Sequence, residues 1–476
     1  MDNRSDTDAG RNCSYDLAVI GAGSAGFSAA ITAADQGANV ALIGHGTIGG
    51  TCVNVGCVPS KTMIRAAESL HGARAAARFP GVSGNAQVDD WRSLIAAKDD
   101  LVSELRQKKY VELLPEYDGI TYQEGAARLD GAGVIVGDVP ITAGKIIIAT
   151  GGRPSVPPIP GIEKVNYLTS TSLLELQELP RSLIVVGGGY VGAELAQMMA
   201  RMGVDVTVVC RSRLLPQVEP EVSEALAEIF RSEGMTLYCG IAYDACREDE
   251  RGVTLCVQEG GRLIELKAER LLFATGRTPN TEALGLEEAG IARDARGAIV
   301  VDNHMRTSKT DIYAAGDVTN RDQFVYMAAY GAKLAALNAL NGDDLAYDNE
   351  AMPWVVFTDP QVAGVGLTEA AARERGFAVK TSVILLDQVP RALAARDTRG
   401  LVKLVADADS GLLLGGQILA PEGSDSIQTL ALALQHGMTA QALGGTIFPY
   451  LTTVEALKLA AQGFDKEVAK LSCCAG

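Results

Sequence analysis

The chain contains the same pattern twice, and this repeat limits the folds that it can adopt. Residues 15–21 and 182–186 are apolar runs that predict strands, and each leads through a glycine-rich turn into a predicted helix. A second predicted strand follows each helix, at residues 39–43 and 204–209. The glycines of the turns are Gly21, Gly23 and Gly26 in the first copy and Gly187, Gly189 and Gly192 in the second. The repeat predicts an α/β fold with two Rossmann-like domains.

A glycine-rich turn between a strand and a helix is suited to binding a nucleotide pyrophosphate. The first glycine permits the tight turn, the second lets the backbone approach the pyrophosphate, and the helix N-terminus supplies oriented N–H groups. The alternative is that neither turn binds a ligand, but both copies have the flanking strand and helix that the motif requires. Two copies predict two dinucleotides, one bound and one exchanged, which suits a redox enzyme.

Charge and composition exclude several other classes of protein. Lys and Arg total 42 and Asp and Glu total 58, so the net charge is −16 and neither nucleic acid nor a membrane is expected as a partner. No apolar run is long enough to span a bilayer, and residues 1–13 lack a secretion signal, so we expect a cytoplasmic protein. Nine cysteines in 476 residues are too few for a disulfide scaffold. Any disulfide is therefore expected to be catalytic.

Two cysteines follow the first repeat in the segment Gly-Gly-Thr-Cys52-Val-Asn-Val-Gly-Cys57-Val-Pro-Ser-Lys. With four residues between them, they can close a small disulfide on one helical turn, and beside a flavin they can exchange two electrons with it. The other interpretation is that both are buried as small hydrophobic side chains. The flanking Gly-Gly-Thr and Pro-Ser-Lys favour the redox role.

This segment, the two glycine turns and the Gly-Asp pair ending at Asp317 resemble the flavin-dependent pyridine nucleotide–disulfide oxidoreductases, from about residue 15 to 476. The resemblance implies FAD, a nicotinamide nucleotide and a homodimer whose active sites are shared across the interface. It implies that Cys57 lies beside the flavin, that Cys52 is the interchange thiol, and that Lys61 lies near the flavin with Glu194 as its partner. It places further FAD contacts at Gly46, Thr51, Ala127, Thr150, Gly151, Asp317 and Val325.

The same resemblance implies an order of domains, with a third, α+β domain at the C-terminus. We expect a disordered tail at residues 1–14, the first part of an FAD-binding domain at 15–152, an NADPH-binding domain at 153–276, a central FAD-binding segment at 277–349 and a dimerisation domain at 350–476. One position departs from the family pattern. Gly44 stands where a glutamate often holds the FAD ribose, so that contact must come from elsewhere or be weaker.

The residue after the second strand of the second repeat bears on the choice of nicotinamide nucleotide. A carboxylate there would accept hydrogen bonds from an NAD ribose, but the chain has Cys210, followed by Arg211 and Arg213. Two guanidinium groups suit the 2′-phosphate of NADPH. We therefore expect NADPH, and the alternative is that both arginines are surface residues without a ligand.

A second cysteine pair, Cys473 and Cys474, lies near the end of the chain. As thiolates, adjacent cysteines are good ligands for a soft metal ion. The related enzymes that cleave disulfides have a histidine where this chain has Tyr450, and that histidine protonates the leaving thiolate. A tyrosine, with a pKa of about 10, is a poor substitute. A metal ion held by two thiolates needs no such group.

The segment Phe-Pro-Tyr450-Leu-Thr, the terminal Ser-Cys-Cys-Ala-Gly and Tyr190 resemble the members of this family that reduce Hg(II). By this resemblance, Tyr190 and Tyr450 line the metal site, and the C-terminal cysteines of one subunit pass Hg(II), free or as a thiol complex, to Cys52 and Cys57 of the other. Electrons from NADPH then reduce it to Hg(0). For Tyr190, ordinary aromatic packing is an equal alternative. Many members also carry an N-terminal metal-capture domain, which we do not expect here.

Other functions remain as alternatives. Some large-type thioredoxin reductases also end in adjacent cysteines, but they should retain the histidine that Tyr450 replaces. Dihydrolipoamide dehydrogenase is disfavoured for the same reason and by Arg211 and Arg213. A metal-binding protein on an inactive reductase fold would not require Cys52, Cys57 and both glycine turns.

Overall fold

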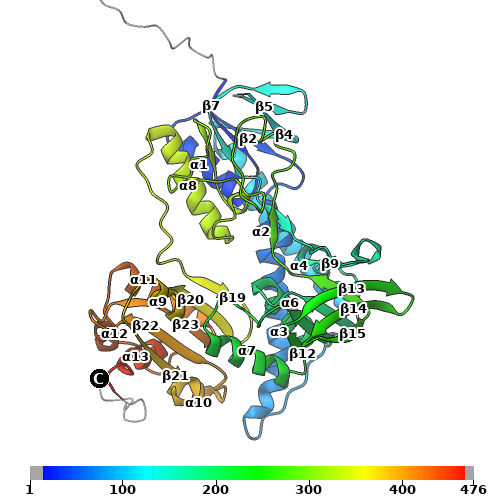
Figure 1. Ribbon diagram of the computed structural model, residues 1–476, viewed down its shortest axis with the longest axis vertical. Coiled ribbons are helices and arrows are strands. Elements are labelled where there is room, and N and C mark those ends of the chain that lie inside the picture. Colours follow the sequence, from blue (N-terminus) through cyan, green and yellow to red (C-terminus); the bar gives the residue numbers. More distant parts are fainter. Residues whose placement is uncertain (1–13, 132, 467–476) are drawn as a thin grey trace, which may run out of the picture. The chain divides into compact units, whose positions relative to one another are not determined.

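The computed structural model describes residues 14–131 and 133–466, which form two compact units (Figure 1). Unit 1 consists of the described residues up to Pro59, Ala97–Pro154 and Arg277–Asp348, and unit 2 consists of Ser60–Ala96, Ser155–Gly276 and the described residues from Asn349 onward. Two long helices, α3 (Cys57–Arg74) and α4 (Trp91–Arg106), contain points at which the chain passes from one unit to the other.

Unit 1 is built on a parallel sheet with the strand order β18-β7-β1-β2-β3. Its strands are β1 (Tyr15–Ile20), β2 (Val40–Gly44), β3 (Ile120–Glu124), β7 (Ala143–Ile148) and β18 (Ile312–Ala314). Helices α1 (Ser24–Asp35) and α8 (Val325–Asn341) pack against each other, and both contact β7. Strands β1, β2, β7 and β18 are mostly buried and form nearly continuous apolar runs, whereas the edge strand β3 is only partly buried and more polar.

Smaller elements complete unit 1. An antiparallel sheet contains β4 (Ala127–Asp130), β5 (Gly133–Val136) and β6 (Val139–Ile141), and β8 (Gly152–Pro154) pairs with β17 (Arg277–Pro279). Helix α2 (Gly50–Val55) and the short helical segments η2 (Gln107–Val111), η3 (Leu114–Glu116) and η5 (Asp317–Thr319) also belong to this unit. The pairing of β8 with β17 joins the two strands that flank residues 155–276.

Unit 2 contains a second parallel sheet, with the order β12-β11-β10-β16-β9. Its strands are β9 (Leu168–Thr169), β10 (Ser182–Val186), β11 (Asp205–Cys210), β12 (Thr236–Cys239) and β16 (Arg270–Phe273), and its helices are α5 (Ser170–Leu173), α6 (Tyr190–Arg201) and α7 (Pro220–Ser232). An antiparallel sheet of β13 (Ala242–Asp249), β14 (Gly252–Glu259) and β15 (Arg262–Ala268) follows β12. Segments η1 (Ala75–Arg78) and η4 (Ile162–Lys164) are short 3-10 turns.

The C-terminal part of unit 2 is an antiparallel sheet covered by helices. The sheet has the order β19-β20-β23-β22-β21, from β19 (Trp354–Val356), β20 (Gln361–Gly366), β21 (Val379–Leu385), β22 (Leu401–Asp407) and β23 (Leu413–Ala420). The helical segments are α9 (Glu369–Glu374), η6 (Leu386–Gln388), α10 (Pro390–Ala395), α11 (Gly423–Gln435), α12 (Ala440–Gly445) and α13 (Glu455–Gln462). Helices α11 and α13 bury one face on this sheet.

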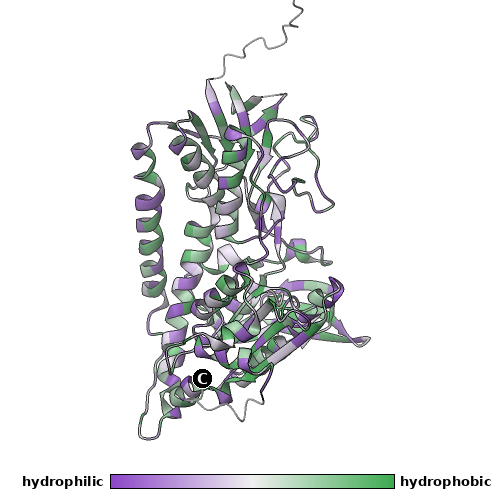
Figure 2. Cartoon of the chain, turned by 90° about the vertical axis from the view of Figure 1, so that its left-hand side faces the viewer, coloured by the Kyte–Doolittle hydropathy of each residue, from purple (hydrophilic) through white to green (hydrophobic). Residues whose placement is uncertain are grey.

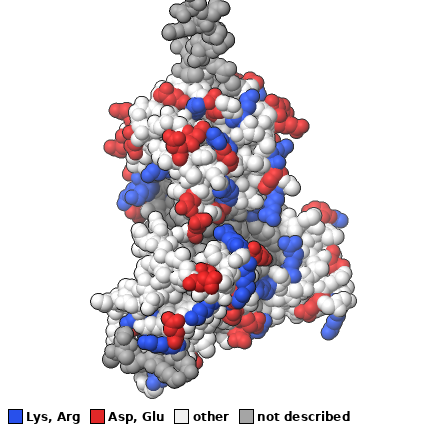
Figure 3. Space-filling view, turned by 60° about the vertical axis from the view of Figure 1, so that its left-hand side comes forward, with Lys and Arg blue, Asp and Glu red and all other residues white. Residues whose placement is uncertain are grey.

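The two parallel sheets and the α+β C-terminal part agree with the predicted fold class. Hydrophobic and hydrophilic residues alternate along the helices, as expected where only one face is buried (Figure 2). Acidic and basic side chains are interspersed on the face in Figure 3. Among the described residues, no helix is long and apolar enough to cross a membrane.

Candidate redox and nucleotide-binding site

The glycine turn after β1 brings the start of α1 close to the sheet. Gly21 has a φ of +121°, and a Cβ atom there would lie 2.2 Å from the carbonyl oxygen of Ala149. A Cβ atom on Gly26 would lie 1.6 Å from the carbonyl oxygen of Gly21, so the helix can pack on the turn only with glycine at this position. Among the described residues, no side chain caps α1, whose N-cap residue is Gly23. The turn therefore presents backbone N–H groups suited to a pyrophosphate.

The turn after β10 has the same geometry. Gly187 has a φ of +119°, and a Cβ atom on Gly192 would lie 2.0 Å from the carbonyl oxygen of Gly187. Helix α6 begins after Gly189, and no side chain of the described residues caps it. The residues present therefore fit two dinucleotides, because in each turn a Cβ atom on the first or third glycine would clash with the backbone and displace the helix N-terminus.

Cys52 and Cys57 lie on two helices rather than on one helical turn, which corrects the expectation from their spacing. Cys52 is in the middle of α2, and Cys57 is the first residue of α3. Gly56 separates the helices, with φ and ψ of −128° and −112°. Both cysteine side chains are half-buried. The break at Gly56 therefore sets the relative orientation of the helix that carries Cys52 and the helix that begins at Cys57.

The start of α2 is packed on the first glycine turn. The Gly49 N–H donates to the carbonyl oxygen of Ala22 at 2.9 Å, and a Cβ atom on Gly50 would lie 2.6 Å from the Cα atom of Gly23. Gly49 and Gly50 both have positive φ, at +96° and +67°. This contact ties the cysteine-bearing helix directly to the turn that is shaped for a dinucleotide.

Tyr110 is a neighbour of the cysteine pair that the sequence pattern did not reveal. It lies in η2, a π-helical turn, and its ring packs edge-on against Phe27 with centroids 4.8 Å apart. Burial raises the pKa of Tyr110, a hydrogen bond with Ser24 lowers it, and the nearby Cys52 and Cys57 raise it further. Such π-turns are frequent at functional sites. In the sequence, Tyr110 stands in a polar Gln-Lys-Lys-Tyr segment without any recognisable motif.

Lys61 and Glu194 form the ion pair that the family resemblance implies. Lys61 Nζ lies 2.7 Å from Glu194 Oε2, and only 6% of the Glu194 side chain is exposed. The other carboxylate oxygen of Glu194 accepts a hydrogen bond from the Phe357 N–H at 2.9 Å. The Lys61 ammonium also lies 4.9 Å from the centre of the Phe357 ring. Lys61 follows Cys57 by one turn of α3, and Glu194 lies in the first turns of α6.

Asp317 is held by Arg277, a residue that was not predicted as part of the site. Arg277 Nε donates to Asp317 Oδ2 at 2.9 Å, and its guanidinium also donates to the carbonyl oxygen of Gly152. Asp317 begins η5 after Gly316, whose φ is +80°. A signal for it exists in the sequence, because an Ala-Thr-Gly motif occurs at residues 149–151 and again at 274–276, directly before Arg277.

The first Ala-Thr-Gly motif is fixed by Asn280. Thr150 Oγ1 donates to the carbonyl oxygen of Asn280 at 2.8 Å, and Asn280 Nδ2 donates to that of Thr150 at 2.9 Å. The Asn280 N–H donates to the Gly151 carbonyl oxygen at 3.0 Å. The other predicted FAD contacts also lie in unit 1: Gly46 after β2, Thr51 in α2, Ala127 at the start of β4 and Val325 at the start of α8.

The structure gives a steric reason for Gly44. A Cβ atom on Gly44 would lie 2.5 Å from the Tyr122 hydroxyl oxygen and 2.9 Å from the Cβ atom of Ala22. Tyr122 comes from the neighbouring strand β3 and occupies the space that a longer residue at position 44 would need. Its hydroxyl forms no hydrogen bond among the described residues. A polar group thus stands beside the first glycine turn where the family often has a glutamate.

Comparison with known proteins places this geometry in a family. The model for pyridine nucleotide-disulphide oxidoreductases matches residues 15–335, and the model for their dimerisation domain matches residues 352–461. Curated mercuric reductases are similar over nearly the whole chain. The protein from Streptomyces lividans is 47% identical over 469 residues, which is 97% of this chain and 98% of the relative. The protein from Staphylococcus aureus is 45% identical, over 98% of this chain and 86% of the relative.

The chain belongs to the mercuric reductase branch of the pyridine nucleotide-disulphide oxidoreductases. A similar solved structure is the Cu(II) complex of the HOCl-induced flavoprotein disulfide reductase RclA from Escherichia coli. It has a TM-score of 0.83 and is 31% identical, and the match covers 95% of this chain and 99% of the RclA chain. The predicted fold class is confirmed, as are FAD and a nicotinamide nucleotide as cofactors. The dimerisation domain makes this member of the family a homodimer.

The two arginines after β11 differ in their surroundings. The Arg213 guanidinium donates to the carbonyl oxygens of Pro216 and Val218, at 3.0 and 2.6 Å, and so closes its own loop. Arg211 is exposed and forms no hydrogen bond or ion pair within the described residues. Of the two, Arg211 is therefore the one with a guanidinium available to a ligand.

Tyr190 and Tyr450 also differ. Tyr190 stacks on Trp354 with ring centroids 5.5 Å apart, and burial raises its pKa. Tyr450 is 55% exposed in the single chain. Glu455, which is buried at the start of α13, accepts a hydrogen bond from the Leu451 N–H at 3.3 Å and so holds the loop that carries Tyr450.

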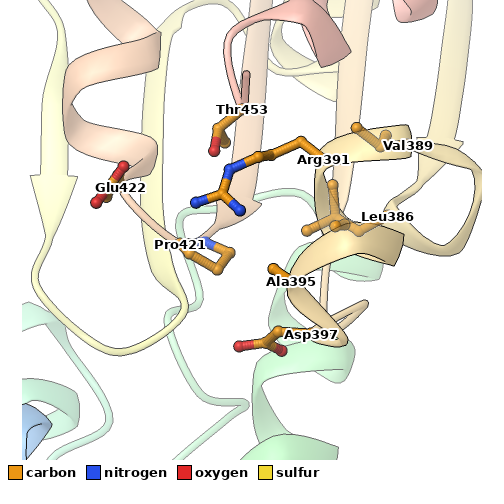
Figure 4. Close-up of a pocket in the computed structure, with 9 residues that line it drawn as sticks. Leu386, Val389, Arg391, Ala395, Asp397, Pro421, Glu422 and Thr453 are labelled. Carbon is orange, nitrogen blue, oxygen red and sulfur yellow. The ribbon is translucent and has the colours of Figure 1, made fainter. Parts of the chain in front are cut away.

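Cys473 and Cys474 lie outside the described residues, as do residues 1–13. A pocket of about 60 Å³ lies beside α10 in the C-terminal domain, where Arg391 reaches between Thr453 and Pro421 (Figure 4). It is far too small for a dinucleotide, and no cysteine lines it. This pocket is therefore not the redox site.

Proposed function

We propose that this protein reduces Hg(II) to Hg(0) with NADPH, through FAD and the Cys52–Cys57 pair. The observation that carries the proposal is the packing of α2 on the first glycine turn, through Gly50 and Gly23, because it fixes a cysteine pair beside a dinucleotide cradle. The 45–47% identity to mercuric reductases selects the metal ion as the substrate within the family. Bound FAD supplies the step that carries two electrons from NADPH to this site.

The chain's own residues bind and exchange the metal. As thiolates, Cys52 and Cys57 hold Hg(II) with two sulfur ligands, which leaves the ion able to exchange. Cys473 and Cys474 of the partner subunit deliver the ion to them, and Tyr190 and Tyr450 line its path. Lys61, fixed by Glu194, places a positive charge one helical turn from Cys57 and stabilises negative charge near it. A cytoplasmic, reducing setting keeps these thiols available.

The remaining residues position the cofactors. We assign the residues of the first turn, Gly46, Thr51, Ala127, Thr150, Gly151, Asp317 and Val325 to the FAD domain parts at 15–152 and 277–349. Tyr122 is added to them as a donor to the FAD ribose, in place of the missing glutamate at position 44. The second turn and Arg211 bind NADPH in the domain at 153–276, and Arg213 supports the loop of Arg211. The dimerisation domain spans 350–476.

The test is release of elemental mercury by the purified homodimer, given NADPH and an Hg(II)–thiol complex. We expect mercury release and NADPH oxidation in step, and we expect both to disappear in Cys52→Ala/Cys57→Ala. The variant Cys473→Ala/Cys474→Ala should keep its flavin and lose most of its turnover on small Hg(II)–thiol complexes. Rapid NADPH-dependent reduction of thioredoxin, with no mercury released, would instead establish a disulfide reductase.

A further inference from the structure

A second pair of thiols lies at the end of the nucleotide-binding sheet in unit 2. Cys210 is the last residue of β11, Cys239 is the last residue of β12, and the two are direct partners in the register of these parallel strands. Their sulfur atoms are 3.0 Å apart. Both are free thiols, and neither belongs to the redox site around Cys52 and Cys57.

The backbone positions of this pair are compatible with a disulfide. Neighbouring strands lie about 4.8 Å apart. That spacing falls within the range of about 4.4 to 6.8 Å between the Cα atoms of natural disulfides. Closure thus requires side-chain rotation and no movement of a strand. The other described pair in unit 2, Cys246 and Cys256, is different. Cys256 is opposite Ala245, so Cys246 projects to the other face of its sheet.

The thiol pair also touches the nucleotide turn and the loop that carries Arg211. A Cβ atom on Gly188, in the middle of the second turn, would lie 3.3 Å from the sulfur of Cys210. The Gly188 carbonyl oxygen accepts the Leu215 N–H at 2.6 Å, and the sulfur of Cys239 accepts a hydrogen bond from the Leu214 backbone. A change in the state of either sulfur therefore acts on the turn and on residues 211–215.

The two thiols have unequal reactivity. The hydrogen bond from Cys210, together with the nearby Arg231, lowers the pKa of Cys239 to about 7 against the opposing effect of burial. The same hydrogen bond, with burial, raises the pKa of Cys210. Cys239 is also the less buried of the two. Because thiolates are the nucleophiles, Cys239 is the residue that reacts first with an oxidant, and Cys210 is placed to resolve the product.

We propose that Cys210 and Cys239 form a second redox pair, which a peroxide oxidises to a disulfide and which thereby weakens nucleotide binding at the second glycine turn. The Cys239 thiolate attacks the peroxide, the O–O bond breaks, and a sulfenic acid and water form once a proton is taken up. The Cys210 thiol then displaces water from the sulfenic acid. Overall, two thiols and one hydrogen peroxide give one disulfide and two waters, and a small dithiol reverses the change.

Peptide mapping tests the modification itself. The homodimer is treated with hydrogen peroxide, its remaining thiols are alkylated, and the digest is searched for linked peptides by mass spectrometry. We expect a linked peptide that joins Cys210 to Cys239, which disappears after treatment with dithiothreitol. If both cysteines are alkylated to the same extent with and without peroxide, the proposal is wrong.

Nucleotide affinity tests the consequence. We expect the Kd for NADP⁺, which carries no hydride and leaves the flavin oxidised, to rise about fivefold on oxidation when measured by titration calorimetry, which corresponds to one lost hydrogen bond, and to recover with dithiothreitol. Cys239→Ser should show no such rise, because it cannot form the disulfide. If Cys239→Ser does not fold, Cys210→Ala takes its place in the same measurement. Cys256→Ser is the matched control, because a serine can still accept from Arg247 and the pair is left intact. An unchanged Kd in the oxidised protein, or an equal rise in Cys239→Ser, would overturn the control of binding.

Discussion

Gly44 and Tyr122 form a complementary pair of residues on neighbouring strands. The side chain at position 44 is absent because the Tyr122 hydroxyl fills its place, 2.5 Å from where a Cβ atom would be. This hydroxyl is half-buried beside the first glycine turn and is available to a ligand. By our proposal, β3 thus provides the polar contact that the family often places on β2.

Replacing this hydroxyl should weaken FAD binding. In Tyr122→Phe, the Kd for FAD should rise about fivefold, since one hydrogen bond of ordinary strength is lost. The fluorescence of the flavin that is released into solution measures this change in the Kd for FAD. Tyr15→Phe is the control, because it removes a hydroxyl bonded to Gln123 at the other end of β1. Equal flavin retention in both variants would remove Tyr122 from the site.

Substitutions of Arg211 and Arg213 should have different effects, one on nucleotide recognition and the other on the stability of the loop. Arg211→Ala should raise the KM for NADPH about tenfold and leave that for NADH nearly unchanged, because a charged contact to the 2′-phosphate is removed. Arg213→Ala loses two hydrogen bonds to backbone carbonyls and should mainly lower the melting temperature. Steady-state kinetics with NADPH and with NADH give the ratio of the two KM values. The assignment fails if Arg211→Ala leaves the preference for NADPH intact.

At the scale of elements, the contact between α2 and the first turn should be intolerant of a methyl group. In Gly50→Ala, the new Cβ atom would lie 2.6 Å from the Gly23 backbone, so α2 and Cys52 must shift away from the turn. We expect flavin loss and a destabilisation of about 2 kcal/mol. Gly37→Ala has a similar φ, +82°, but no atom within 4 Å, so it measures backbone strain alone. Equal flavin content in the two variants would show that the packing is unimportant.

Lys403 joins the nucleotide-binding part of unit 2 to its C-terminal sheet. Its ammonium, almost completely buried, lies 3.1, 2.9 and 2.9 Å from the carboxylates of Glu219, Glu221 and Glu369. The hydrogen bond from Lys403 lowers the pKa of Glu369. The stabilisation from Glu369 is therefore complete above the pKa of an unfolded glutamate and is lost as the pH falls through the lowered value.

Lys403→Met should lower the free energy of unfolding by about 3 kcal/mol, because it leaves the buried Glu219 carboxylate without its ion pair. Denaturant titration at neutral pH measures this loss, which should shrink as the pH is lowered and the glutamates become protonated. Lys380→Met removes an exposed lysine paired with Asp465 and should cost less than about 1 kcal/mol. A similar cost in both variants would contradict the assigned role of the buried cluster.

At the scale of the whole molecule, our proposal makes the dimer decide which thiols meet. If Cys473 and Cys474 serve the partner's site, a mixed dimer of Cys52→Ala/Cys57→Ala and Cys473→Ala/Cys474→Ala contains one complete site. Such dimers, purified with two different tags, should release mercury at about half the rate of the unmodified dimer, while both mutant homodimers are poorly active. An inactive mixed dimer would mean that each tail serves its own subunit.

Local pattern was sufficient for the fold class, and the roles of the candidate site residues stay predictions. Glycine spacing between an apolar strand and a helix has one main structural cause, so both turns could be predicted, whereas the roles of Cys52, Cys57 and Asp317 were inferred from the family resemblance. The spacing of the cysteines alone did not reveal that Gly56 divides them between α2 and α3, because a helix break depends on the φ and ψ that the surrounding chain imposes.

The sequence by itself determined two Rossmann-like domains, a cysteine pair after the first and a C-terminal α+β domain, since these follow from periodicity and motif. Only the tertiary structure decided which side chains from separate strands share one space. Tyr122 fills the place at Gly44, Arg277 holds Asp317, and Cys239 lies against Cys210. Such contacts depend on sheet order and register, which bring together residues that are distant in the chain and carry no common local signal.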